Sequence, residues 1–182
     1  MKLPTPAILF ACAMPLQCLA LDLQVVGPDG NPLMEAEAAL IFSSGAHQTG
    51  RRENEVIKFE PFSGRATLVV AAFGHEGVSR TINPDDSSPV TLKPSANRSS
   101  KLLQGKTDLP GKGGAIKISL SGHSNPVIQG FGIGFEAGGR PARQPMEFRL
   151  KSPLSAVDST GGSFKLYVLE VSQSVALVEF TP

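Results

Sequence analysis

The feature that most constrains this chain is the alternation of short apolar runs with turn-forming residues. After residue 20 the apolar runs are separated by Gly, Pro, Asn and Asp and recur at intervals of about 8–12 residues. This pattern is typical of β-sandwiches and barrels, whereas a βαβ fold needs helical segments between its strands. We therefore predict an all-β protein made of two consecutive β-sandwich modules.

The apolar runs of the first half alternate as half-buried strands do. In the segment 21–26, Leu21, Leu23 and Val25 fall on one face. The segment Leu33–Leu40 is rich in helix formers, but a Gly-Pro-Asp-Gly-Asn-Pro turn precedes it, so we interpret it as a strand. The most apolar run, Arg65–Phe73, is predicted to be a central strand. Further strands are expected at 56–59, 77–82 and 89–92.

A polar segment rich in turn formers, Lys93–Gly114, separates the two halves. We interpret it as a linker or long connection, which predicts a first module at 21–96 and a second, Gly-rich module at 97–182. Four or five strands are expected in the second module, at 115–120, 126–135, 146–150, 164–171 and 174–180. Within the fourth of these, Tyr167, Leu169 and Val171 are predicted to share one face.

The first 20 residues have the three parts of a secretory signal peptide. Lys2 supplies the positive charge, Pro6–Leu16 the uncharged apolar stretch, and Cys18-Leu19-Ala20 the cleavage site. The apolar stretch is shorter than the roughly 20 residues of a spanning helix, and prolines interrupt it. We therefore predict cleavage near Ala20, export to the periplasm or the cell surface, and no integral membrane segment afterwards. Gln17 disfavours lipid attachment at Cys18.

Cleavage would remove both cysteines, so the mature chain would have no disulfide and no thiolate metal site. Its charge would be balanced: the 17 Lys and Arg less Lys2 leave 16, against 16 Asp and Glu. No basic run is present, which argues against a nucleic-acid partner. The chain has no Trp and one Tyr, Tyr167, and this scarcity disfavours stacking on sugar rings.

The first module resembles the carboxypeptidase-regulatory-like, prealbumin-like β-sandwich domains, whose fold is Ig-like with Greek-key connections. The resemblance covers Leu21–Pro94 and rests on turn and core signals, which specify fold more than activity. Members of this superfamily act as folding or docking modules on peptidases, as stalk modules, or as extracytoplasmic accessory domains. The matching parts are an opening strand at Val25-Val26, the turn Asp29-Gly30-Asn31-Pro32-Leu33, a strand at Ala38–Phe42, a central element at Gly64–Gly74, and a closing pair, Val90 and Leu92.

Two departures from the superfamily narrow what the resemblance implies. Stalk-forming relatives often carry an internal Lys–Asn cross-link, but no lysine occurs in Leu21–Val26. Prealbumin-like hydrolases carry paired histidines and a C-terminal Tyr-Arg-Gly-Ser, whereas this chain ends in Val178–Pro182. The enzymatic branch is therefore not expected here.

No set of residues with catalytic or metal-binding spacing stands out. His47, His75 and His123 are far apart in predicted loops, so no metal or cofactor site is predicted. No Gly-x-Ser-x-Gly motif is present, and Asp158-Ser159-Thr160-Gly161-Gly162 lacks the second copy that an aspartic peptidase needs. Asp85-Asp86 is interpreted as a solvated turn, and Arg51–Glu55 as a mixed-charge run that caps a hairpin.

The candidate recognition surface lies in the second module. Glycine at alternate positions leaves one face of a strand without side chains, so that another backbone or a ligand can approach closely; a covered strand inside the sandwich is the alternative. A flexible loop with two arginines is predicted beside it, and loops on a β scaffold are the usual contact surfaces. The candidate residues are Gly130, Phe131, Gly132, Gly134, Arg140 and Arg143.

From these observations we expect a non-catalytic extracytoplasmic protein that binds another envelope or extracellular protein, through loops or by strand addition at a sheet edge. The alternative is an accessory module that binds carbohydrate or an envelope polymer. An enzyme with an unrecognised site is the third hypothesis.

Overall fold

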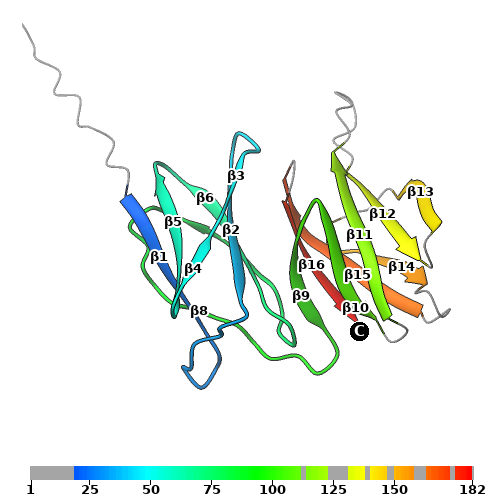
Figure 1. The fold of residues 1–182 in the computed structure, drawn as a ribbon. Coiled ribbons are helices and arrows are strands. Elements are labelled where there is room, and N and C mark those ends of the chain that lie inside the picture. The colour runs from blue at the N-terminus through cyan, green and yellow to red at the C-terminus, as the bar shows by residue number, and fades with distance from the viewer. Residues whose placement is uncertain are drawn as a thin grey trace, which may run out of the picture.

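A computed structural model describes residues 19–111, 114–122, 131–137, 140–146, 150–157, 163–172 and 175–181 of the 182-residue chain. All regular elements within these ranges are β-strands, arranged in four sheets of four strands each (Figure 1). The predicted all-β sandwich fold is therefore confirmed. Among the described residues no helix is long and apolar enough to cross a membrane.

The first half of the chain forms two facing sheets, with strand orders β4-β5-β1-β8 and β3-β2-β6-β7. Neighbouring strands are antiparallel except β1 and β8, which pair in parallel. The strands are β1 (Leu19–Val26), β2 (Glu37–Phe42), β3 (His47–Thr49), β4 (Arg51–Glu53), β5 (Val56–Phe62), β6 (Ala66–Ala71), β7 (Val78–Ile82) and β8 (Val90–Thr91).

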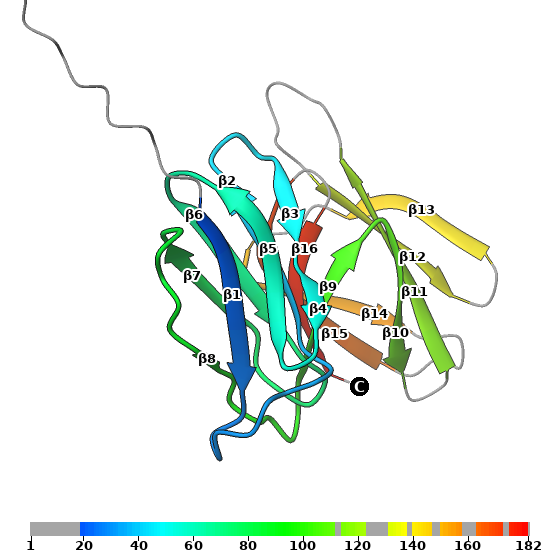
Figure 2. The same cartoon turned by 60° about the vertical axis from the view of Figure 1, so that its left-hand side comes forward.

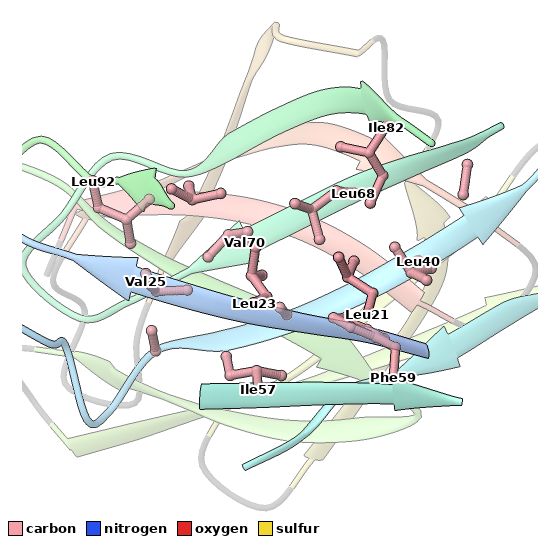
Figure 3. Packing of buried hydrophobic residues seen from close by; sticks show 14 of the residues in the cluster. Leu21, Leu23, Val25, Leu40, Ile57, Phe59, Leu68, Val70, Ile82 and Leu92 are labelled. Carbon is pink, nitrogen blue, oxygen red and sulfur yellow. The ribbon is translucent and has the colours of Figure 1, made fainter. Parts of the chain in front are cut away.

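The core between these two sheets follows the alternation seen in the sequence. Leu21, Leu23 and Val25 of β1 point to one side and are at most 2% exposed. They meet Leu40 of β2 and Leu68 of β6 from the facing sheet (Figure 3). Burial of each such side chain contributes about 1.5–3 kcal/mol, so the alternation in β1 is enough to specify which of its faces turns inward.

Gly50 marks the corner where the chain leaves one sheet for the other. Thr49 ends β3 in the second sheet, and Arg51 begins β4 in the first. A Cβ atom on Gly50 would lie 2.3 Å from Cγ2 of Ile57 and 2.8 Å from Cζ of Phe59. Glycine is therefore required at this corner because the core side chains of β5 pack directly against its backbone.

The second half also forms two sheets, with strand orders β14-β15-β16-β9 and β10-β11-β12-β13, all antiparallel. A second corner glycine, Gly105 with φ +62°, lies between β9 and β10 where the chain changes sheet. The strands are β9 (Ser99–Gln104), β10 (Lys106–Gly111), β11 (Gly114–Gly122), β12 (Phe131–Ala137), β13 (Arg140–Met146), β14 (Pro153–Val157), β15 (Ser163–Val171) and β16 (Val175–Thr181).

The interpretation of Lys93–Gly114 as a linker is wrong over most of its length. Strands β9 and β10 occupy it from Ser99 to Gly111, and the described part of this half holds eight strands instead of four or five. The polar composition of β9 is misleading because its pairing with β16 supplies the hydrogen bonds, and the opening serines bond across the molecule. Strand formation was decided here by the partner strand.

Two further expectations about the second half are corrected. Arg140–Met146 is not a loop but the edge strand β13, where prolines lacking an N–H are tolerated. Leu169 and Val171 do not share a face: Leu169 packs against the cluster between the two halves, whereas Val171 packs against the core of the second half. A β-bulge between Val168 and Glu170 shifts the alternation by one residue.

The two halves pack face to face through an apolar cluster of their own. The outer face of β2 and β6 contributes Ala39 and Val69, and the sheet of β9, β15 and β16 contributes Leu102 and Leu177, all at most 3% exposed. Strands β9 and β16 of the second half accordingly face the first half (Figures 1 and 2). We call this contact region the joint. It continues the core, since β6 and β16 are buried on both faces.

The predicted domain boundary near Asn97 falls between two core clusters. One draws only on residues from Leu21 to Leu92, and the other only on residues from Leu103 to Phe180. The predicted signal peptide, Met1–Ala20, lies outside the described residues as far as residue 18. Leu19 and Ala20 are exposed at the start of β1, and Leu21 is the first buried residue.

Candidate functional site

The residues predicted to form a recognition surface lie on two neighbouring strands. Gly130 is outside the described residues; Phe131, Gly132 and Gly134 belong to β12, which has β11 and β13 as neighbours. Arg140 and Arg143 belong to β13, and Ala137 pairs with Arg140 at the closed end of this hairpin. The structure therefore places Phe131, Gly132 and Gly134 on a strand, as predicted, and places Arg140 and Arg143 on the neighbouring strand of the same sheet and not in a loop.

The two histidines that the structure describes lie on different elements. His47 lies on β3 and not in a loop, His75 lies in a turn where its Nδ1 is 2.9 Å from the Phe73 carbonyl oxygen, and His123 is outside the described residues. Within the described part of the chain no group of three His, Cys, Asp or Glu residues is placed to hold a metal ion. The Asp158–Gly162 segment also lies outside the described residues.

The two acidic turns are structural. Asp29 accepts the Asn31 N–H at 3.1 Å, and Gly30 has φ +79°, as the sequence predicted for this turn. The hydrogen bonds that Asp29 accepts from the backbone N–H and the side-chain amide of Asn31 hold the pKa of Asp29 below its ordinary value. Asp86 accepts the Ser88 N–H at 3.2 Å and lies 3.8 Å from Arg80, so it serves a turn in the same way.

A groove opens at the joint beside β9, with a volume of about 460 Å³. Its walls come from β2, β3 and β4 on one side and from β9 on the other. We call it the joint groove. Its polar lining consists of Glu37, Thr49, Arg52, Lys101 and Gln104.

Glu37 and Lys101 form an ion pair across the joint groove. The second carboxylate oxygen of Glu37 accepts the Leu102 N–H at 3.4 Å. The Ser100 N–H bonds the Ala72 carbonyl at 3.3 Å. Two outward N–H groups of edge strand β9 are therefore already bonded to the first half, and this edge is not a free template for strand addition.

Arg52 enters the same groove from β4 and is held by backbone carbonyls. Its Nη2 donates to the carbonyl oxygens of Leu33 at 3.0 Å and Ala36 at 2.8 Å. Its Nη1 is shielded from solvent and has no acceptor, and Arg52 forms no salt bridge with any described residue. Burial lowers the pKa of Arg52, because a desolvated guanidinium lacks the water that would stabilise its charge.

A second cavity, of about 320 Å³, lies on the other side of the Glu37–Lys101 pair. Phe73 is 56% exposed there, and its ring centroid is 6.5 Å from that of buried Phe180. The exposed carboxylates of Glu35 and Asp108 also line this cavity. The two hollows differ in charge, since cations predominate in the first and carboxylates in the second.

Polar contacts fix the halves relative to each other near these hollows. Buried Glu179 accepts the Gly77 N–H at 3.0 Å and pairs with Arg98 at 3.1 Å. The Arg98 guanidinium also lies over the ring of Tyr167, 4.5 Å from its centroid. The Ser100 hydroxyl accepts the Ala72 N–H at 3.0 Å. The walls of the groove are therefore tied together by buried hydrogen bonds as well as by apolar packing.

The sequence offered little indication of this site. Arg51–Glu55 was interpreted as a hairpin cap, and it does contain strand β4 and the turn before β5, but nothing local placed Arg52 near Lys101. Its partner carbonyl at Leu33 is 19 residues away in the chain. The one signal in the sequence was an arginine, Arg52, close to the predicted strand at 56–59.

The fold and the site together define an all-β sandwich protein with a groove between two packed halves. Comparison of the chain with protein-family models, curated proteins and solved structures finds no match. The resemblance of the first module to the carboxypeptidase-regulatory-like domains therefore stays a prediction.

Proposed function

We propose that this chain is a non-catalytic, extracytoplasmic accessory protein that binds another protein at the joint groove. The observation that carries the proposal is the groove itself. Its two walls come from different halves of the molecule, which are held in register by the shared apolar cluster and by Glu179. A site with walls fixed in this way loses little conformational entropy on binding.

The surroundings of the groove suit an extended polypeptide. Strand β3 is at the edge of its sheet and supplies Thr49 to the lining. Edge strands bind extended peptides through main-chain hydrogen bonds, and neighbouring side chains supply specificity. The export and the resemblance to docking modules that the sequence predicts both agree with such a role, because accessory domains of that superfamily act outside the cytoplasm.

Site-specific photocrosslinking in the native host tests the proposal. A photoreactive residue at Thr49 is expected to capture a discrete polypeptide, because Thr49 is exposed and lines the groove. The same residue at Glu60, exposed on β5 outside the groove lining, is the matched control and should capture nothing comparable. Capture of polysaccharide alone, or identical products at both positions, would show that the groove does not bind a protein.

A further inference from the structure

We infer that the joint groove takes a carboxylate group of the partner polypeptide, with Arg52 as its counter-ion. This inference rests on the proposed function and adds the chemistry of the partner. A segment with an acidic side chain, or a free C-terminus, would meet the requirement.

The argument begins with the hydrogen bonding of Arg52. Two backbone carbonyls, those of Leu33 and Ala36, hold its Nη2 and so fix the guanidinium plane. Its Nη1 is buried without an acceptor. A buried donor without a partner is unfavourable, and a desolvated charge without a counter-ion more so. A carboxylate in the groove would supply the counter-ion that the half-buried guanidinium of Arg52 lacks among the described residues, because guanidinium and carboxylate form strong charge-assisted hydrogen bonds.

The other charges of the lining leave this need unmet. Glu37 is already paired with Lys101 and accepts the Leu102 N–H. The lining therefore holds two cations, Arg52 and Lys101, against one anion, which is a net charge of +1. The positive charge is concentrated at Arg52, on the opposite wall from β9, so an incoming carboxylate is attracted to a defined place in the groove.

The shape of the lining favours a polypeptide over a sugar acid. The described lining has no aromatic side chain on which a sugar ring would stack, and it includes the small residues Ala38, Thr49 and Gly50. Small side chains beside edge strand β3 leave room for an extended backbone to approach. A volume of about 460 Å³ is within the range of binding pockets in proteins.

Fluorescence polarisation with synthetic peptide pools tests the inference on the protein lacking residues 1–20. Two pools of labelled decapeptides differ only in a fixed central Glu or Gln, each with a free or an amidated C-terminus, and a glucuronate oligosaccharide is the third probe. We expect the Glu or free-C-terminus pools to bind at least about tenfold more tightly than their neutral counterparts. The two termini distinguish a side-chain carboxylate from a terminal one.

Three variants locate the effect. Arg52→Gln should remove the preference for the carboxylate. Arg52 also donates hydrogen bonds to the Leu33 and Ala36 carbonyl oxygens, so the circular dichroism spectrum and melting curve of this variant must first show that it is folded. Thr49→Glu tests the same preference without removing these hydrogen bonds. Thr49 is exposed, so Thr49→Glu adds a competing carboxylate beside the groove without disturbing the core, and should also abolish the preference. Glu60→Gln, which changes an exposed carboxylate of β5 outside the groove lining, should retain it.

The outcomes separate this inference from the proposed function. Equal binding of the Glu and Gln pools and of the free and amidated C-termini, while Thr49 still crosslinks to a polypeptide, would overturn the carboxylate site and leave protein binding intact. Binding of the oligosaccharide in place of the peptides would overturn the polypeptide as the occupant. Absence of both crosslinks and peptide binding would overturn the two proposals together.

Discussion

Glu179 of β16 ties the two halves of the molecule together, and its replacement by alanine should destabilise the whole fold. The carboxylate is 7% exposed and accepts hydrogen bonds from the Gly77 N–H in the first half and from Arg98. Alanine has no polar side-chain atom, so it cannot accept the hydrogen bond from either donor. The perturbation therefore acts on the joint and not on either core.

The expected loss is about 3 kcal/mol. Leaving the part-buried Gly77 N–H without an acceptor costs about 1–3 kcal/mol. The bond from Arg98 contributes less, about 0.5–1 kcal/mol, because Arg98 is 44% exposed and water replaces the carboxylate. Urea unfolding followed by circular dichroism measures the sum, and a loss of this size lowers the melting temperature of a protein this long by roughly 6–12 °C.

Glu170→Ala is the matched control. Glu170 also accepts a hydrogen bond from the first half, from the Ser79 hydroxyl at 3.3 Å, but this contact is exposed. Its removal should change the free energy of unfolding by less than about 0.5 kcal/mol. Equal losses in the two variants, or a loss below about 1 kcal/mol for Glu179→Ala, would refute the claim that burial of this carboxylate stabilises the joint.

Three other predictions concern the core, the acidic turn and the predicted signal. Gly50→Ala should cost about 1–3 kcal/mol in urea unfolding because its Cβ would clash with Ile57 and Phe59, whereas Gly77→Ala, whose nearest neighbours are flexible leucine ends at 3.0 Å or more, should cost less. Because the pKa of Asp29 is lowered by folding, its contribution to stability is complete above the unfolded-state pKa and is lost as the pH falls through the folded-state pKa. Asp29→Asn should therefore lessen the acid-induced loss of stability, and an unchanged pH profile of urea midpoints would contradict this. Removal of residues 1–20 should leave the melting temperature unchanged, because the buried part of β1 begins at Leu21.

Local patterns in the sequence were sufficient for the elements that depend on neighbouring residues. The alternation of Leu21, Leu23 and Val25 predicted the buried face of β1, and Arg65–Phe73 was correctly predicted to contain a central strand. The turn at Asp29 was predicted in detail because its hydrogen bonds join residues two positions apart. In each case the physical cause lies within a few residues of the feature.

The tertiary structure decided what depends on distant partners. Strands β2 and β6 have consecutive apolar residues, at 38–41 and 68–71, yet only the packed fold shows that the second half covers their outer face. Strand β9 exists because β16 pairs with it, and a bulge in β15 reversed the predicted face of Val171. The ion pair across the joint groove likewise connects Glu37 to Lys101, which is 64 residues away in the chain.

The sequence by itself thus determined an all-β chain, the inward face of its first strands, and the chemistry of its tight turn, because alternation and turn geometry act over short distances. Only the tertiary structure decided that the two halves share an apolar joint and that Arg52 lies there half-buried, without a counter-ion among the described residues. Burial and charge pairing depend on which surfaces meet, and in this protein they meet across residues far apart in the chain.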